Sequence, residues 1–187
     1  WGKKVVREFC NENDIPIIER KEILNYQNID FLISVLYPFI IEKEILEVAS
    51  VANINLHQAP LPEYKGCNAC SHAIINGDNF YGATLHLMSE ELDSGAIIHK
   101  ETFGIKEDWN AFELYEYTTM ICLKIFKSHL SNILTNSFET YPQTGKFSKT
   151  YPRNSLDDKR IDLNWDYSRA KNFVRGLDFP PFESAYY

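Results

Sequence analysis

Phe31-Leu-Ile-Ser-Val-Leu36 is a continuous apolar run, bounded by Asp30 and Pro38, in the first quarter of this 187-residue chain. A short run of this kind is typical of a parallel strand that is covered on both faces. Further along the chain, Asn53 to Leu56 is a second candidate for a buried strand. Two longer strand-like runs follow, Tyr81 to Met88 and Ala96 to Ile105.

Helical patterns alternate with these strands, because apolar residues recur three or four positions apart. In the longest of them, Asn110 and Glu113 have the spacing of a helix-capping pair. Such an alternation favours an α/β domain with a mainly parallel sheet flanked by helices. We expect helices over residues 1–12, 21–26, 42–49, 68–75, 110–134 and 167–177, and a short strand over residues 15–18.

The chain opens with a helix, whereas a doubly wound α/β sheet normally opens with a strand. We therefore expect that one or more N-terminal strands are missing and that the chain is an internal fragment of a longer polypeptide. Residues 1–136 form the expected core. Residues 137–187 are expected to be a linker and a C-terminal extension of the same domain.

Composition narrows the range of functions. Hydrophobic residues make up 44% of the chain and charged residues 24%, which excludes a disordered chain. The net charge of −7 argues against a general nucleic-acid coat, which needs an excess of Lys and Arg. The longest uncharged apolar run, Phe31 to Ile41, is too short to cross a bilayer. Four cysteines are too few for a disulfide-dense secreted scaffold, so a reducing cytoplasm is the simpler interpretation.

Two polar residues, Asn55 and His57, stand at the end of the second strand candidate. Ligands of open α/β sheets bind at the carboxyl ends of the strands, and residues two apart on a strand point the same way. An amide and an imidazole in this arrangement can both reach a single oxygen atom. Taken alone, the pair has a plainer interpretation, in which Asn55 bonds the backbone and His57 begins the loop.

The surrounding sequence changes that interpretation. The segment Asn55-Leu-His-Gln-Ala-Pro-Leu-Pro-Glu-Tyr-Lys-Gly66 precedes Gly82-Ala-Thr-Leu-His-Leu-Met-Ser-Glu-Glu-Leu-Asp93-Ser-Gly95. In order and separation, these blocks resemble the N10-formyltetrahydrofolate-dependent formyltransferase family. The resemblance extends over residues 30–105 and resumes more weakly over residues 161–186. It implies a Rossmann-like fold in which residues 1–136 are the catalytic core. Gln58 departs from the family pattern, since many members have Pro there.

The resemblance implies that Asn55, His57 and Asp93 are the catalytic residues. In the family's reaction an amine attacks the formyl carbon of the folate, and negative charge develops on the formyl oxygen. Asn55 and His57 can donate hydrogen bonds to that oxygen. A histidine coupled to a carboxylate can shuttle the proton that the amine loses. Asp93 taken alone is also compatible with a turn-capping role.

The resemblance also implies where N10-formyltetrahydrofolate, the co-substrate, binds. Two segments are expected to line its ring system, namely the stretch after the first strand candidate and the loop before Asp93. For Ile41, plain core packing is an equally good interpretation. The expected cofactor-binding residues are Tyr37, Phe39, Ile40, Ile41, Glu90, Glu91 and Leu92.

The resemblance leaves the formyl acceptor open among a purine precursor, initiator methionyl-tRNA and a nucleotide-linked amino sugar. Residues 141–175 hold eight basic and four acidic side chains in an otherwise acidic chain. That balance suits a compact anion such as a sugar-nucleotide pyrophosphate, although a solvated surface explains any one of these residues equally well. The segment Gln58-Ala-Pro-Leu-Pro62 and the pair Gly66-Cys67 are similar to the sugar N-formyltransferases, and by this resemblance the expected acceptor is a dTDP-linked amino-dideoxyhexose. The expected substrate-binding residues are Lys65, Tyr151, Arg153 and Arg175.

Three other functions remain as alternatives: a methionyl-tRNA formyltransferase, a formyl-tetrahydrofolate hydrolase and a non-catalytic member of the fold. The favoured function implies a cytoplasmic enzyme of lipopolysaccharide or O-antigen biosynthesis. Its expected partners are folate and a nucleotide sugar, without membrane or nucleic acid, and a homodimer is compatible with it. No metal site is expected, because Cys67 and Cys70 form a CxxC pair without a second pair or a His cluster.

Overall fold

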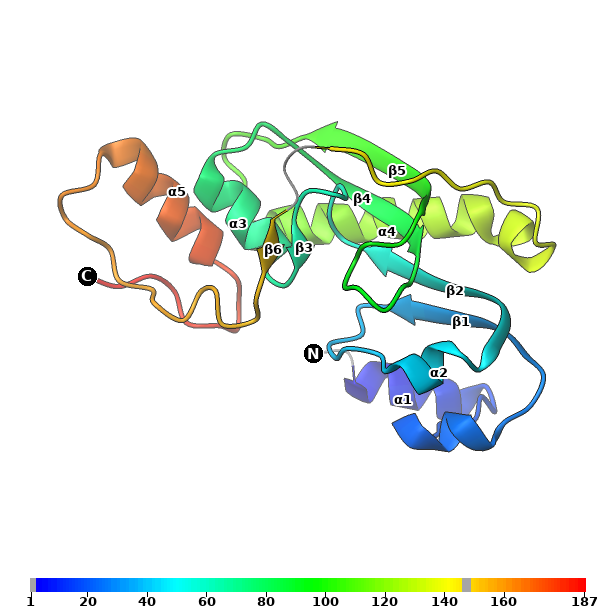
Figure 1. Cartoon of the computed structure of the whole chain (residues 1–187). Helices are drawn as coiled ribbons and strands as arrows, with labels where there is room; N and C mark the ends of the chain where they lie inside the picture. The colour runs from blue at the N-terminus through cyan, green and yellow to red at the C-terminus, as the bar shows by residue number, and fades with distance from the viewer. Residues whose placement is uncertain (1–2, 146–148) are drawn as a thin grey trace.

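A four-stranded sheet runs through the middle of the fold, with its longest helix lying across it (Figure 1). The computed structural model describes residues 3–145 and 149–187. The strands follow one another in the spatial order β1-β2-β4-β5. A second, two-stranded sheet pairs β3 with β6 in parallel. The strand bounds are β1 (Ile29–Val35), β2 (Ala49–His57), β3 (Lys65–Gly66), β4 (Phe80–Leu87), β5 (Ile97–Gly104) and β6 (Thr150–Tyr151).

The α/β class with a central sheet is confirmed, but the expected mainly parallel pairing is wrong for the described strands. Within the four-stranded sheet only β1 and β2 run parallel, whereas β2 with β4 and β4 with β5 are antiparallel. The connection from β4 to β5 covers only residues 88–96, and a parallel crossover needs a dozen residues or more. Before β4, the helix α3 (Ala69–Asn76) packs on other helices, α5 (Tyr167–Leu177) and α4 (Ala111–Leu134), instead of forming a parallel crossover.

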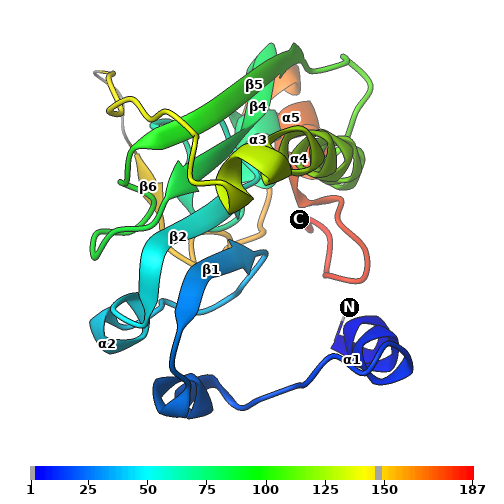
Figure 2. The same ribbon diagram turned by 90° about the vertical axis from the view of Figure 1, so that its right-hand side faces the viewer.

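The expected helices are present, with two changes of length and type. Residues 20–25 form a 3₁₀ helix, η1 (Arg20–Asn25). The helix expected over residues 42–49 is a single turn, α2 (Lys43–Leu46), because Ala49 already begins β2. The prediction of a strand over residues 15–18 is wrong, since this segment has no regular secondary structure and pairs with no described strand. Figure 2 shows that it joins the first helix, α1 (Lys3–Glu12), which is set apart from the sheet.

The hydrophobic core lies between one face of the sheet and α4. Along β2, Ile54 and Leu56 are buried and alternate with Asn55 and His57, as the two-residue period of a strand requires. The buried pair packs in one cluster with Leu85 of β4 and with residues of α4, which covers that face (Figure 2). The polar pair therefore lies on the face of the sheet opposite α4.

The N-terminus of α4 has a side-chain cap. Asn110 Oδ1 accepts a hydrogen bond from the Glu113 backbone N–H at 2.8 Å, and Glu113 Oε2 accepts one from the Asn110 N–H at 2.8 Å, so the predicted capping pair is confirmed. After α4, β6 pairs with β3 and α5 packs on α3. Of the helices in the described ranges, none is both long enough and apolar enough to span a membrane.

We expect Leu85→Ala to lower the free energy of unfolding by about 2–5 kcal/mol, because it empties a fully buried position between the sheet and α4. The matched control is Leu163→Ala, since the Leu163 side chain is 82% exposed. Urea unfolding followed by circular dichroism measures both variants. Equal unfolding midpoints for the two would contradict this description of the core.

Candidate active site

Asn55, His57 and Asp93 come together on the face of the sheet opposite α4. His57 Nδ1 lies 3.8 Å from Asp93 Oδ2, and both side chains are nearly buried, at 11% and 8% exposed. Asn55 lies two residues before His57 on the same side of β2. The three residues predicted from two separate sequence blocks thus share one site.

The Asp93 carboxylate and its backbone are held in place by β3 and by Gln143. Its Oδ2 accepts a hydrogen bond from the backbone N–H of Gly66 at 2.8 Å. Gln143 binds the backbone on both sides of Ser94, with Nε2 donating to the carbonyls of Asp93 and Gly95 at 2.8 Å each. Asp93 itself has a φ of 49°, in the left-handed region that non-glycine residues rarely adopt. The loop before β5 therefore has one tightly specified conformation.

The orientation of the His57 ring follows from its hydrogen bond. Nε2 lies 2.9 Å from the carbonyl oxygen of Tyr64, and because a carbonyl only accepts, Nε2 carries the proton. Nδ1 is then the ring nitrogen that faces Asp93. The 3.8 Å separation is longer than a direct hydrogen bond, and one water molecule can bridge two groups at this distance.

A second histidine, His86, completes the cluster, although from the sequence alone a histidine inside a strand pattern is most simply interpreted as a structural residue. It is opposite Asn55 in the β2–β4 ladder, and its side chain is 1% exposed. His86 Nε2 lies 3.1 Å from Asn55 Nδ2 and 3.8 Å from Asp93 Oδ1. Burial lowers the pKa of His86 to about 4. Only the antiparallel register brings this histidine into the site.

The segments expected to bind the folate lie close to each other. An ion pair of 2.6 Å joins Lys43 Nζ to Glu90 Oε1 and so connects the neighbourhood of residues 37–41 to the loop before Asp93. Phe39 and Ile40 are 57% and 71% exposed, and Leu92 in the opposite loop is 44% exposed. Tyr37 and Ile41 are less exposed, whereas Glu91 is an exposed residue of the same loop. Apolar side chains are thus accessible in both segments.

The residues expected to bind the acceptor differ in where the structure places them. Lys65 is buried, and its Nζ donates to Ser94 Oγ at 2.6 Å, next to Asp93. Arg153 donates to the Pro38 carbonyl, at the expected folate segment. Tyr151 is 6% exposed and its ring packs between Tyr64 and His72, with centroid distances of 5.6 and 3.8 Å.

The Arg175 guanidinium binds backbone carbonyl groups of the segment between β5 and α4. Its Nη1 donates to the Trp109 carbonyl at 2.8 Å and also to the Glu107 carbonyl, and its Nη2 donates to Asn172 Oδ1 at 2.8 Å. These contacts include no member of the Asn55, His57 and Asp93 trio. Of the four expected acceptor residues, Lys65 is the one that contacts the neighbour of a predicted catalytic residue.

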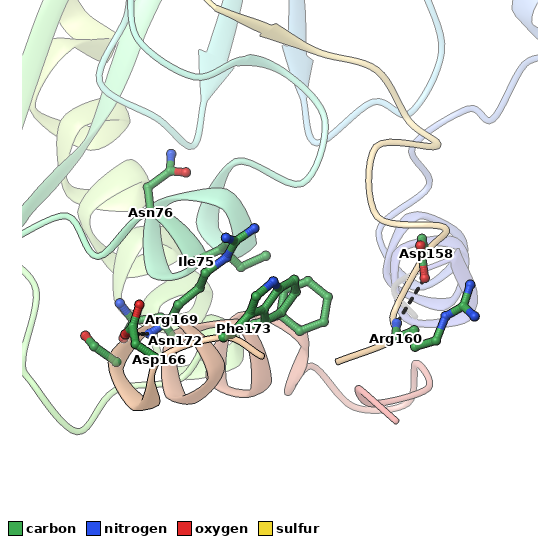
Figure 3. Close-up of a pocket in the computed structure, with 10 residues that line it drawn as sticks. Ile75, Asn76, Asp158, Arg160, Asp166, Arg169, Asn172 and Phe173 are labelled. Atoms are coloured by element: carbon green, nitrogen blue, oxygen red, sulfur yellow. Dashed lines mark hydrogen bonds between the residues drawn. The ribbon is translucent and has the colours of Figure 1, made fainter. Parts of the chain in front are cut away.

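A separate hollow of about 680 Å³ lies between the end of α3, α5 and the segment that leads into α5 (Figure 3). It contains two basic residues of the region 141–175, Arg160 and Arg169, and the Arg169 guanidinium lies 4.3 Å from the Trp165 ring centroid. None of the residues that line this hollow belongs to the trio or to the expected folate segments.

No metal site accompanies the cluster in the part of the chain that the structure describes. Across residues 3–145 and 149–187, no group of three or more His, Cys, Asp or Glu side chains is arranged to hold a metal ion. Cys67 and Cys70 are free thiols. Burial raises the pKa of Cys70 to about 12, so this thiol stays protonated at neutral pH.

The fold and the site define a class: an α/β domain with an amide, an imidazole and a carboxylate together on one face of its sheet. The sequence model of the formyl transferase family matches residues 18–126, which is more than half of the chain. The chain therefore belongs to the formyl transferase family, and the predicted resemblance is confirmed.

Similar proteins agree with this assignment. A methionyl-tRNA formyltransferase of Clostridium tetani is 32% identical over 201 residues, which cover 100% of this chain and 64% of the relative. Among solved structures, an N-formyltransferase of Helicobacter canadensis in complex with folinic acid and dTDP-3-aminofucose has a TM-score of 0.83 at 25% identity. The match covers 92% of this chain and 63% of that one. WlaRD, a sugar 3N-formyl transferase solved with dTDP and 5-N-formyl-THF, has a TM-score of 0.86 at 26% identity, covering 95% and 64%. This chain thus spans less than two thirds of the length of these three proteins.

We expect Gly95→Ala to displace the loop that holds Asp93. A Cβ atom at this position would lie 1.8 Å from the carbonyl oxygen of Leu87, which belongs to the backbone and cannot move aside cheaply. The matched control is Gly104→Ala, where the nearest atom would be 3.9 Å away. Hydrogen exchange measures the effect, since the Gly66 amide that bonds Asp93 should exchange faster in Gly95→Ala only. Unchanged Gly66 protection in that variant would contradict the description of the loop.

Proposed function

We propose that the protein transfers a formyl group from N10-formyltetrahydrofolate to the amino group of a nucleotide-linked amino sugar. The observation that carries the proposal is the meeting of Asn55, His57 and Asp93 at one end of β2, with His57 Nδ1 3.8 Å from Asp93 Oδ2. An amide donor, an imidazole and a carboxylate are the groups that acyl transfer to an amine needs. The membership in the formyl transferase family supports the same reaction.

Each member of the trio has a distinct role in this reaction. The amine nitrogen attacks the formyl carbon with its lone pair, and Asn55 Nδ2 donates to the formyl oxygen on which negative charge develops, a contact worth about 10²–10³ in rate. The new C–N bond forms as the bond from the formyl carbon to folate N10 breaks. His57 and Asp93 carry the proton from the attacking nitrogen to N10, a transfer worth about 10²–10⁴ in rate.

The residues beside the trio fit the folate. Phe39, Ile40 and Leu92 expose apolar side chains on the two loops joined by the Lys43–Glu90 ion pair. An aromatic ring system is well suited to bind between such side chains, and backbone groups of the same loops can bind its polar edge. Tyr37, Ile41, Glu90 and Glu91 belong to the same proposed site. Two solved relatives were crystallised with folate derivatives.

Two observations favour an amino-sugar nucleotide as the acceptor. Lys65 Nζ contacts Ser94 Oγ, one residue from Asp93, so a cation capable of binding a phosphate oxygen lies beside the proposed reaction centre. The solved structures of similar fold include complexes with dTDP-3-aminofucose and dTDP. We propose a dTDP-linked amino-dideoxyhexose, with Arg153 near the folate segment as a further contact. For Tyr151 and Arg175, a direct contact with the acceptor remains a prediction.

A second candidate acceptor is methionyl-tRNA. It is favoured by the curated relatives, among which methionyl-tRNA formyltransferases of Clostridium species reach 32% and 33% identity. The net charge of −7 weighs against it, because affinity for a long nucleic acid comes from phosphate neutralisation by excess basic residues.

Formyl transfer to an amino sugar also implies where in the cell the protein acts, as part of the same proposal. A formylated amino sugar is a building block of lipopolysaccharide and O-antigen, so the protein would act in the cytoplasm, where folate and nucleotide sugars are available. A homodimer remains a prediction that follows only from the family resemblance.

The proposal is tested by incubating the full-length protein with N10-formyltetrahydrofolate and a panel of amino-sugar nucleotides, with methionyl-tRNA as a parallel acceptor. We expect tetrahydrofolate to form only when a dTDP-amino sugar is present. Turnover without any amine would identify a hydrolase, and turnover with methionyl-tRNA alone would identify the second candidate. No turnover under any condition would leave a non-catalytic member of the fold.

We expect His57→Ala and Asp93→Ala each to reduce single-turnover formyl transfer by at least about 10²-fold, because each removes part of the proton path. Binding of the nucleotide sugar should change little, since neither side chain is proposed to contact the phosphates. Single-turnover kinetics measure the first quantity and calorimetry the second. Normal turnover in either variant would remove this mechanism.

A further inference from the structure

His86 is joined to Asn55 across the antiparallel ladder of β2 and β4. The two residues are register partners, so their side chains project from the same face of the sheet. His86 Nε2 lies 3.1 Å from Asn55 Nδ2, and His86 Nδ1 lies 2.8 Å from the Leu87 carbonyl oxygen. With a side chain 1% exposed, His86 has both ring nitrogens engaged by the protein.

These two contacts determine the proton positions on the His86 ring. The Leu87 carbonyl only accepts, so Nδ1 must carry a proton. In the neutral ring Nε2 is then a bare acceptor, and it takes one N–H from the Asn55 amide. The contact therefore specifies which end of the Asn55 side chain is nitrogen, because an Oδ1 in that place would face a lone pair.

The charged groups around His86 are compatible with a neutral ring. His57 faces it with a ring-centroid distance of 6.2 Å, Asp93 Oδ1 lies 3.8 Å from Nε2, and Lys65 is the third titratable neighbour. Burial first, then His57 and Lys65, lower the pKa of His86 to about 4, although the hydrogen bond to the Leu87 carbonyl and the Asp93 carboxylate favour the protonated ring. The ring is consequently neutral at physiological pH.

We propose that His86 is a positioning residue that holds the Asn55 amide with its nitrogen fixed, so that the second Nδ2–H is free to donate to the formyl oxygen. This inference rests on the proposed function. An amide rotates by half a turn at little cost when nothing distinguishes its two ends, and a turned amide would present Oδ1 to the developing negative charge. His86 thus gives Asn55 the preorganisation on which oxyanion stabilisation depends.

Two substitutions separate the two contacts of His86. In His86→Gln, the side-chain amide reaches about as far as Nε2, so its oxygen can accept from Asn55 while the bond to Leu87 is lost. In His86→Asn, the shorter amide reaches about as far as Nδ1, so the bond to Leu87 can be kept while the acceptor for Asn55 is lost. If His86 had only a structural role, the two variants would lose formyl transfer to the same extent, or His86→Gln would lose more.

We expect His86→Asn to lower kcat for formyl transfer about tenfold to a hundredfold, which is less than the effect of removing an oxyanion donor outright, with little change in KM for either substrate. His86→Gln should keep kcat closer to that of the wild type. In an Asn55→Ala background, His86→Asn should have no further effect, because residues that act through one another are not additive. Equal losses in the two single variants, or a full additional loss in the double variant, would overturn the proposal.

Two further measurements keep this inference separate from the proposed function. Nitrogen-15 NMR of the wild-type protein should show His86 protonated at Nδ1 and bare at Nε2 at neutral pH, and a protonated Nε2 would overturn the proposal without any activity assay. The matched control for removal of a histidine from the sheet is His99→Asn, which lies on β5 with its ring against His129 and should transfer formyl groups at the wild-type rate. If the wild type itself transfers nothing, the proposed function fails, whereas the NMR result still decides the role of His86.

Discussion

The hydrogen bond from the Gly66 amide to the Asp93 carboxylate joins β3 to the loop before β5, and the candidate site depends on it. Both segments need a glycine for their close backbone approaches. Gly66 has a φ of 88°, and a Cβ atom there would lie 2.3 Å from the Tyr151 carbonyl oxygen. Gly95 leaves no room for a side chain against Leu87. Two backbone approaches that only glycine permits thus place a carboxylate over the end of a strand that carries an amide and an imidazole.

The two faces of the sheet have different roles: one packs against α4 in the core, and the other carries the residues of the candidate site. On the α4 side, Ile54 and Leu56 of β2 pack against the helix, and Gln58 just beyond the strand donates to Thr119 Oγ1 of α4 at 2.6 Å. On the other side, Asn55 and His57 meet residues from β4 and the loop that follows it. Because residues alternate along a strand, the packing that fixes β2 also fixes the direction of its polar side chains. The packing of the core therefore also keeps the side chains of the site in fixed directions.

The sequence allowed the α/β class, most helices and the Asn55, His57 and Asp93 cluster to be predicted, because these depend on local patterns and on a recognisable pair of blocks. The direction of β4 was not predictable in the same way. A helix stands between β2 and β4, which suggested a parallel crossover, but α3 packs on α4 and α5 instead.

Sequence patterns did not predict that His86 and Gln143 contribute to the site, and the same cause applies to both residues. His86 reaches Asn55 through the antiparallel register, and Gln143 reaches the Asp93 loop from a segment without regular structure, fifty residues away. Neither contact corresponds to a regular spacing of residues in the sequence, so a sequence pattern does not predict it. Tyr151 illustrates the reverse case, since a residue expected at the acceptor has its ring between Tyr64 and His72, where packing energy accounts for it.

The central claim is that the amide and the imidazole of β2 and the carboxylate of the following loop act on one formyl group. A crystal structure of the full-length protein with an N10-formyl folate analogue bound, in the absence of any acceptor amine, is the decisive measurement. We expect the formyl oxygen about 2.7–3.1 Å from Asn55 Nδ2, with His57 and Asp93 on the same side of the sheet around it. A formyl group bound away from β2, or an Asn55 amide that turns Oδ1 toward it, would contradict the account.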